Sequence, residues 1–139
     1  MKYRPKRPLR SYQAKALKRA LEIDYGTAIW FDPGLGKTKV AIDFIAIQRL
    51  KHGLSRVLVI APLSALGVWV DELKLDMIDE LKYTVYIPNG RRANKIKVLE
   101  EALRPGSDLR FIVCTYEFAT DEYFNKQLIK FRPQLLKIG

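Results

Sequence analysis

Short apolar runs alternate with helix-like segments along this chain, and this alternation is what most constrains its fold. The apolar runs lie at 27–31, 57–60, 84–87 and 111–114. Apart from the first, at 12–23, the expected helices follow these runs, at about 37–50, 64–73, 91–103 and 119–136, the last interrupted by Pro133. Strands that alternate with helices predict a parallel sheet within an α/β layered domain.

The size and composition narrow the class of protein further. The 139 residues suit about one domain, and a hydrophobic share of 48% argues against disorder. No apolar stretch approaches the roughly 20 residues of a membrane-spanning helix, and no signal-peptide core follows the basic start, so we expect an intracellular location, in the cytoplasm, the nucleus or a host cytoplasm. A single cysteine, Cys114, and a single histidine, His52, exclude an internal disulfide and a His/Cys zinc centre.

The charge balance points to a polyanionic partner. Lysine and arginine number 25 against 15 acidic residues, a formal net charge of +10, which attracts nucleic acid above all. A basic surface that serves only solubility is the alternative. Residues 1–10 form a basic arm that Pro5 and Pro8 favour as extended backbone. A second basic group lies on the expected helix at 91–103, where it is either solvated or in contact with nucleic acid; it consists of Arg91, Arg92, Lys95 and Lys97.

The strongest single motif is the glycine-rich segment Gly34-Leu35-Gly36-Lys37-Thr38, which follows an expected strand and opens an expected helix. Glycines let backbone N–H groups approach phosphate oxygens, and the start of a helix adds unpaired N–H groups and partial positive charge. Lys37 can reach the β- and γ-phosphates, while the hydroxyl of Thr38 can ligate Mg²⁺. The strict pattern would have glycine where Phe31 stands, and a chance Gly-Lys-Thr loop is the alternative.

Together with this loop, other segments resemble the Swi/Snf-type branch of the superfamily-two helicases and translocases. In chain order the matching segments are Leu9-Arg10-Ser11-Tyr12-Gln13, Asp32 to Thr38, Val57 to Ser64 with Trp69 and Glu72-Leu73, and Ile112 to Glu117. The resemblance implies a P-loop NTPase fold of the RecA-like type. Residues 11–139 would then form an incomplete first lobe behind the basic arm at 1–10.

The resemblance also implies roles for individual residues. Gln13 would read adenine, although an exposed helical glutamine is the plainer interpretation. ATP and Mg²⁺ would bind at Gly34, Leu35, Gly36, Lys37 and Thr38. Nucleic acid, DNA rather than RNA, would lie against Pro62, Ser64, Thr115 and Tyr116. Ser64 also stands where a helix is expected to start and can serve as its N-cap, and Trp69 is expected in the core.

An ATPase of this kind needs a pair of carboxylates for Mg²⁺ and for the attacking water. In the family that the chain resembles, the pair comes as Asp-Glu-x-His, and no such segment follows Glu117 within the 139 residues. Two acidic pairs imitate it, but Asp71-Glu72 continues a helix and Asp79-Glu80 lacks a preceding strand. We therefore expect weak ATP binding without hydrolysis by this chain alone, and either self-association, a partner such as the second helicase lobe, or a rearranged sheet.

The leading hypothesis is thus the N-terminal, ATP-binding portion of a Swi/Snf-like, nucleic-acid-dependent ATPase motor. A non-catalytic module that binds nucleic acid or a protein through its basic surface is the alternative. A small P-loop kinase is a third possibility, favoured only if Asp71-Glu72 completes an acidic pair near the loop.

Overall fold

The computed structural model describes residues 4–8, 11 and 37–129, and within 37–129 helices and strands alternate as the apolar pattern predicts. The expected helix at 12–23, the expected strand at 27–31 and the end of the last helix lie outside the described residues. The strands are β1 (Arg56–Ile60), β2 (Tyr83–Tyr86) and β3 (Leu109–Cys114). The helices are α2 (Lys37–His52), the 3-10 turn η1 (Leu63–Ala65), α3 (Leu66–Asp76), α4 (Arg92–Ala102), α5 (Tyr116–Thr120) and α6 (Glu122–Ile129).

The described strands form a parallel sheet in the order β1-β3-β2. Phe111 of β3 lies at the same level as Val57 of β1 and Val85 of β2. Every residue of β3 is buried, as a central strand covered on both faces requires. The predicted α/β class with a parallel sheet is therefore confirmed.

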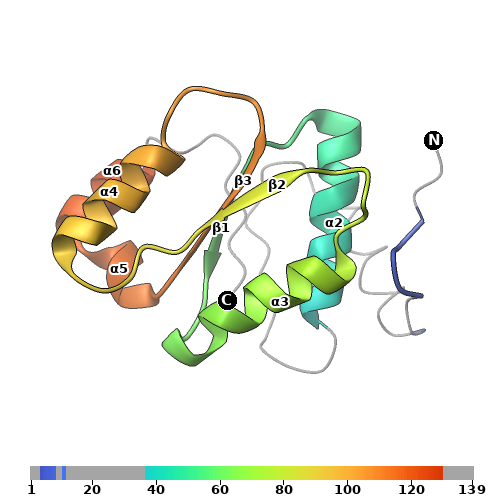
Figure 1. Ribbon diagram of the computed structural model, residues 1–139, viewed down its shortest axis with the longest axis horizontal. Coiled ribbons are helices and arrows are strands. Elements are labelled where there is room, and N and C mark those ends of the chain that lie inside the picture. Colours follow the sequence, from blue (N-terminus) through green and yellow to red (C-terminus); the bar gives the residue numbers. More distant parts are fainter. Residues whose placement is uncertain (1–3, 9–10, 12–36, 130–139) are drawn as a thin grey trace.

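Helices cover both faces of this sheet, α2 and α3 on one side and α4, α5 and α6 on the other (Figure 1). Because successive strand residues point to opposite faces, the two sides have separate cores. Val57, Phe111 and Val113 pack with α2 and α3, whereas Leu58 and Ile112 pack with the opposite layer. Trp69 of α3 is buried in the first of these cores, as expected.

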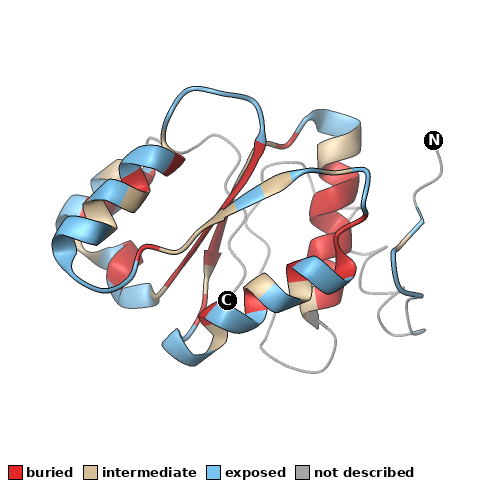
Figure 2. Ribbon diagram, in the orientation of Figure 1, coloured by how far each residue is buried: buried red, intermediate tan, exposed pale blue. Residues whose placement is uncertain are grey.

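Helix α2 is more deeply buried than its sequence predicts. Apolar residues at helical spacing predict a broad apolar face, but every residue from 39 to 48 is buried (Figure 2). The buried set includes the polar residues Lys39, Asp43 and Gln48. A helix that is enclosed on all sides needs partners for such groups. Lys39 and Asp43 pair with each other, whereas the side-chain oxygen of Gln48 is buried without a hydrogen-bond partner among the described residues.

The starts of two helices differ from the expectation. The segment expected as one helix at 64–73 begins as η1, and the N-cap of α3 is Ala65, with no side-chain hydrogen bond. The prediction that Ser64 caps a helix is therefore wrong. The segment after β3 starts at Tyr116 and breaks at Asp121, because the carboxylate of Asp121 accepts hydrogen bonds from the backbone N–H groups of Tyr123 and Phe124 and so starts α6.

Candidate functional site

The carboxyl edge of the sheet gathers most of the residues that the sequence singled out. Helix α2 ends where the chain enters β1, so its start at Lys37 lies toward the edge where β1 and β3 end. The backbone N–H of Ala61 donates to the carbonyl of Cys114 over 2.9 Å, which holds the ends of β1 and β3 together. Ligand sites of open parallel sheets lie at this edge.

The nucleotide-binding residues are only partly within the described chain. Gln13, Gly34, Leu35 and Gly36 lie outside it, whereas Lys37 and Thr38 form the first two residues of α2. No acidic residue stands in the first turn of α2, so no carboxylate of that turn neutralises the positive end of the helix dipole. This donor set, a lysine and a hydroxyl at a helix start, fits a phosphate and its Mg²⁺.

The strand-end residues expected to face nucleic acid are accessible to different degrees. Pro62 and Ser64 are exposed, Pro62 as the N-cap of η1 and Ser64 within that turn, and the start of the turn has no side-chain cap. Thr115 is half-buried, and its hydroxyl accepts a hydrogen bond from the N–H of Phe118 over 3.2 Å and so caps α5. Tyr116 stands 68% exposed at the start of α5. Tyr116 and Ser64 are thus exposed to a ligand, while the hydroxyl of Thr115 accepts a hydrogen bond within the protein and keeps its O–H as a donor.

Basic side chains border the same edge at the start of α4. Arg91 is exposed at the N-cap position. Arg92 lies 3.6 Å from the carboxylate of Asp121, and its guanidinium sits over the rings of Tyr123 and Phe124 at 5.5 and 4.9 Å from their centres. Arg92 therefore ties α4 to α6, which leaves Arg91 as the more accessible charge, and Lys95 and Lys97 follow along α4.

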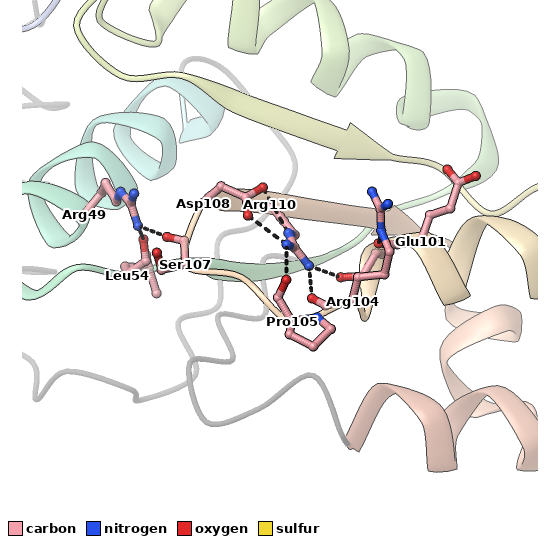
Figure 3. Close-up of polar contacts among 9 residues, drawn as sticks. Arg49, Leu54, Glu101, Arg104, Pro105, Ser107, Asp108 and Arg110 are labelled. Atoms are coloured by element: carbon pink, nitrogen blue, oxygen red, sulfur yellow. Dashed lines mark hydrogen bonds and ion pairs between the residues drawn. The ribbon is translucent and has the colours of Figure 1, made fainter.

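At the opposite edge of the sheet, the side chains of Arg110 and Arg49 bind carboxylate and carbonyl groups of the protein itself (Figure 3). Arg110, at the start of β3, has a buried guanidinium that bonds the carboxylate of Asp108 at 2.7 and 3.0 Å and the carbonyl groups of Ala102, Arg104 and Pro105. Hydrogen bonds from Arg110 hold the pKa of Asp108 below its ordinary value. Arg49 likewise donates to carbonyls at Leu54 and Ser107. These charges are not available to a polyanion.

Neither acidic pair that imitates the catalytic carboxylates follows a strand. Asp71 and Glu72 lie inside α3, and Asp79 and Glu80 lie in the connection from α3 to β2. Among the residues with described positions, no three acidic, histidine or cysteine side chains are grouped to hold a metal ion. The kinase hypothesis depended on Asp71-Glu72, and the helical position of that pair gives it no support. Over the same residues, no helix has the length and apolar character to cross a membrane.

A buried ionic cluster next to the start of α2 was not predicted. The ammonium group of Lys39 lies 3.1 Å from the carboxylate of Asp43 and 3.6 Å from that of Asp76 on α3. Both carboxylates are wholly buried, and the side chain of Lys39 is 6% exposed. The signal available in the sequence was the spacing of four between Lys39 and Asp43 within an apolar helix.

A parallel sheet with helices on both faces, and a lysine and threonine that open a helix toward its carboxyl edge, define a RecA-like lobe of the helicase type. Residues 6–134 match the family model described as Type III restriction enzyme, res subunit (ResIII), and the chain belongs to this family. This match and a curated helicase relative support the predicted relation to Swi/Snf-type superfamily-two helicases.

One curated relative is the ATP-dependent helicase ULS1 of Saccharomyces cerevisiae, 29% identical over 93 residues. The match covers 66% of this chain but only 6% of that helicase.

Solved structures share the fold. The Sulfolobus solfataricus SWI2/SNF2 ATPase core in complex with dsDNA superposes with a TM-score of 0.63 at 21% identity, over 98% of this chain and 32% of that one. The core domain of the same protein gives a TM-score of 0.57 at 22% identity, again over 98% and 32%. A nuclease-deletion mutant of the Type ISP restriction-modification enzyme LlaGI, in complex with a DNA substrate mimic, gives 0.57 at 18% identity over 96% and 17%. At these identities the likeness shows the fold alone.

Proposed function

We propose that this chain is the ATP-binding portion of a nucleic-acid-dependent helicase or translocase motor. The observation that supports the proposal is that the start of α2 and the ends of β1 and β3 lie toward one edge of the sheet. The helix that starts with Lys37 and Thr38 lies toward the same sheet edge as two exposed strand-end segments, which the bond from Ala61 to Cys114 holds together. Nucleotide on the helix start and a polyanion on the strand ends would then be neighbours.

At the nucleotide, each residue has a distinct task. Gly34, Leu35 and Gly36 would present backbone N–H groups to the phosphates, and Gln13 would select adenine through its amide. Lys37 would bind the β- and γ-phosphates, and the Thr38 hydroxyl would hold Mg²⁺. When bound, Mg²⁺ neutralises charge on the phosphates. The absence of acidic residues from the first turn of α2 supports this assignment.

At the nucleic acid, the backbone phosphates are the expected points of contact. Ser64 offers an exposed hydroxyl within η1, two residues beyond Pro62, and Tyr116 offers an exposed ring and hydroxyl. Thr115, which is committed to capping α5, would contribute by holding Tyr116 in place. The dsDNA complex of the Sulfolobus core and the DNA mimic bound by LlaGI support DNA as the polyanion.

Calorimetric titration with ATP and Mg²⁺ tests the nucleotide site. Replacing Lys37 with alanine is expected to weaken binding about tenfold or more, because charge-assisted hydrogen bonds contribute about 1.5–3 kcal/mol each. Lys51→Ala is the matched control, since Lys51 is exposed near the far end of the same helix. Equal ATP affinity in Lys37→Ala and the unaltered protein would show that this loop does not bind nucleotide.

Hydrolysis is a separate question from binding. The 139 residues contain no Asp-Glu-x-His segment after Glu117, and the described acidic pairs do not follow a strand. We therefore expect this chain alone to bind ATP without measurable turnover. Release of phosphate by the isolated chain, abolished by Lys37→Ala, would contradict that part of the proposal.

A non-catalytic nucleic-acid module is the second candidate, and the exposed basic residues at the start of α4 favour it. Arg91 is open to solvent, and Lys95 and Lys97 follow on the same helix. Titration of duplex DNA at several salt concentrations, with and without ATP, separates the two candidates. DNA affinity that falls steeply with salt and ignores ATP favours the module, whereas affinity that depends on ATP favours the motor.

A further inference from the structure

The N-terminal arm docks on helix α3 through two adjacent basic residues. The guanidinium of Arg7 bonds both oxygens of the Asp76 carboxylate, from Nε at 2.6 Å and from Nη2 at 2.8 Å. Lys6 donates to the carbonyl of Lys74 at 3.2 Å and to the carboxylate of Asp79 at 3.0 Å. Arg7 thus makes the two-pronged contact that only arginine offers, whereas Lys6 makes a looser one at the surface.

The two contacts differ in what they reach. Asp79 is an exposed carboxylate, so the pair with Lys6 is solvated. Asp76 is wholly buried and also lies 3.6 Å from the ammonium group of Lys39, whose other partner is Asp43 at 3.1 Å. A continuous chain of charges therefore runs from the arm, through α3, into α2.

Arg7 supplies a second cation to the buried carboxylate of Asp76. Its Nη2 also lies 3.7 Å from the half-buried carboxylate of Glu72, on the same helix α3. Without Arg7, the described contacts leave Asp76 with the ammonium group of Lys39, at 3.6 Å, which Asp76 shares with Asp43. Removing one partner of a buried ion pair is strongly destabilising, so the cluster would have to rearrange or admit water.

A rearrangement of this cluster would change the position of the first turn of α2. Lys39 is the third residue of this helix, two residues beyond Lys37 and one beyond Thr38. Its ammonium group lies between Asp43 of the same helix, at 3.1 Å, and Asp76 of α3, at 3.6 Å, and Asp76 is held in turn by Arg7. A shift of Lys39 toward another partner would move the turn that carries Lys37 and Thr38, and small misplacements of binding groups are costly for ligand contacts.

We propose that Arg7 is a positioning residue for the nucleotide site: through Asp76 and Lys39 it holds the first turn of α2, with Lys37 and Thr38, in the place that phosphate binding requires. The inference rests on the proposed function of that turn. The basic arm would thus hold α3 and α2 together, and Arg7 would affect nucleotide binding without touching the nucleotide.

The protonation of the pair agrees with the geometry. Burial alone would raise the pKa of Asp76, but the hydrogen bond from Arg7 and the charge of Lys39 together keep this pKa below its ordinary value. The hydrogen bond to Asp76 likewise raises the pKa of Arg7. The carboxylate is therefore ionised, and the electrostatic link to Lys39 is present, at neutral pH.

Binding of a fluorescent ATP analogue with Mg²⁺ to the full 139-residue chain tests the proposal, at a temperature where circular dichroism shows each variant folded. Arg7→Ala is expected to raise the Kd about tenfold. Arg7→Lys, which keeps the charge, should recover part of the loss. Lys6→Ala is the matched control from the neighbouring position and should leave the Kd unchanged.

A double variant separates an effect through Asp76 from a general loosening. If Arg7 acts through Asp76, Arg7→Ala combined with Asp76→Asn should bind about as weakly as Arg7→Ala alone, because the two changes disrupt one unit. Multiplied losses in the double variant would overturn the proposed route. If Arg7→Ala does not fold, Arg7→Gln carries the test, since it removes the charge but keeps a hydrogen-bond donor, and it should also raise the Kd.

The outcomes also distinguish this inference from the proposed function. A lower melting temperature with an unchanged Kd in the Arg7 variants would show that the arm only stabilises the fold, and the inference would be wrong. If Lys37→Ala loses nucleotide binding while the Arg7 variants bind normally, the nucleotide site is supported and only the positioning role of Arg7 is refuted. If the unaltered chain and Lys37→Ala bind equally, both are refuted.

Discussion

Two carboxylates that pair with the same arm should contribute very differently to the free energy of unfolding. Asp76 is fully buried and bonded by Arg7 at 2.6 and 2.8 Å, whereas the side chain of Asp79 is 85% exposed and lies 3.0 Å from Lys6. Removing one partner of a buried ion pair costs about 3–5 kcal/mol. Because Arg7 is itself half exposed and can regain water, we expect the lower end, about 3 kcal/mol, for Asp76→Ala. Asp79→Ala should cost about 0–1 kcal/mol.

Urea unfolding followed by circular dichroism measures both values under the same conditions. With a slope of about 1–3 kcal/mol per molar urea, a loss of 3 kcal/mol moves the midpoint down by about 1–3 M, and a loss below 1 kcal/mol moves it by less than about 1 M. The slopes should stay equal, so that the midpoints report stability. Equal midpoints for Asp76→Ala and Asp79→Ala would refute the reasoning, because burial would then have made no difference.

The pH dependence of the same difference has a definite sign. The pKa of Asp76 in the folded protein lies below its ordinary value of 3.8, owing to Arg7 and Lys39, although burial opposes this. A lowered pKa stabilises the folded state at pH values above the unfolded pKa, and the contribution is lost as the pH falls through the folded pKa. The gap in stability between the unaltered protein and Asp76→Ala should therefore be full at neutral pH and shrink below about pH 4.

Other predictions concern the sheet edges and the thiol. Gly106→Ala is expected to destabilise the fold by about 1–3 kcal/mol, because the added methyl group would overlap the guanidinium of Arg110, whereas Gly67→Ala in α3 meets nothing within 4 Å and should stabilise by about 0.5–1 kcal/mol, both checked by urea midpoints. Burial raises the pKa of the Cys114 thiol to about 12, so a thiol reagent at about pH 8 should react only after unfolding, and fast reaction of the folded protein would contradict its burial. Arg91→Ala should lower the slope of log affinity for DNA against log salt by about 1, and an unchanged slope would remove this residue from the interface.

Local patterns in the sequence predicted the order of elements well. The helix expected at 37–50 is Lys37–His52, and the strands expected at 57–60 and 84–87 are Arg56–Ile60 and Tyr83–Tyr86. These segments follow apolar periodicity and turn residues, which act over a few neighbours in the chain. The strand expected at 111–114 starts earlier, at Leu109, because Leu109 and Arg110 already pair with β2, and the backbone N–H of Arg110 donates to the carbonyl of Ser55 just before β1.

Local patterns were less informative about the segments that follow the strands. Ser64 looked like a helix cap, but the chain turns through η1 first and α3 starts without a side-chain cap. The nucleic-acid contact expected at Thr115 stays a prediction, and the structure adds that the Thr115 hydroxyl accepts a hydrogen bond as the cap of α5. In both cases the path of the backbone after the strand decides which hydroxyl is free, and that path depends on packing against the rest of the sheet.

The amino-acid sequence by itself determined the α/β class, the parallel sheet and the position of Lys37 and Thr38 at the start of a helix, because each depends on residues within one turn or one strand. Only the tertiary structure decided that Lys39, one position beyond Thr38, is buried against Asp76, and that Arg7, 69 residues before Asp76, bonds the same carboxylate. Charges attract according to distance in space, and separations in space between residues far apart in the chain are set by how the helices pack on the sheet.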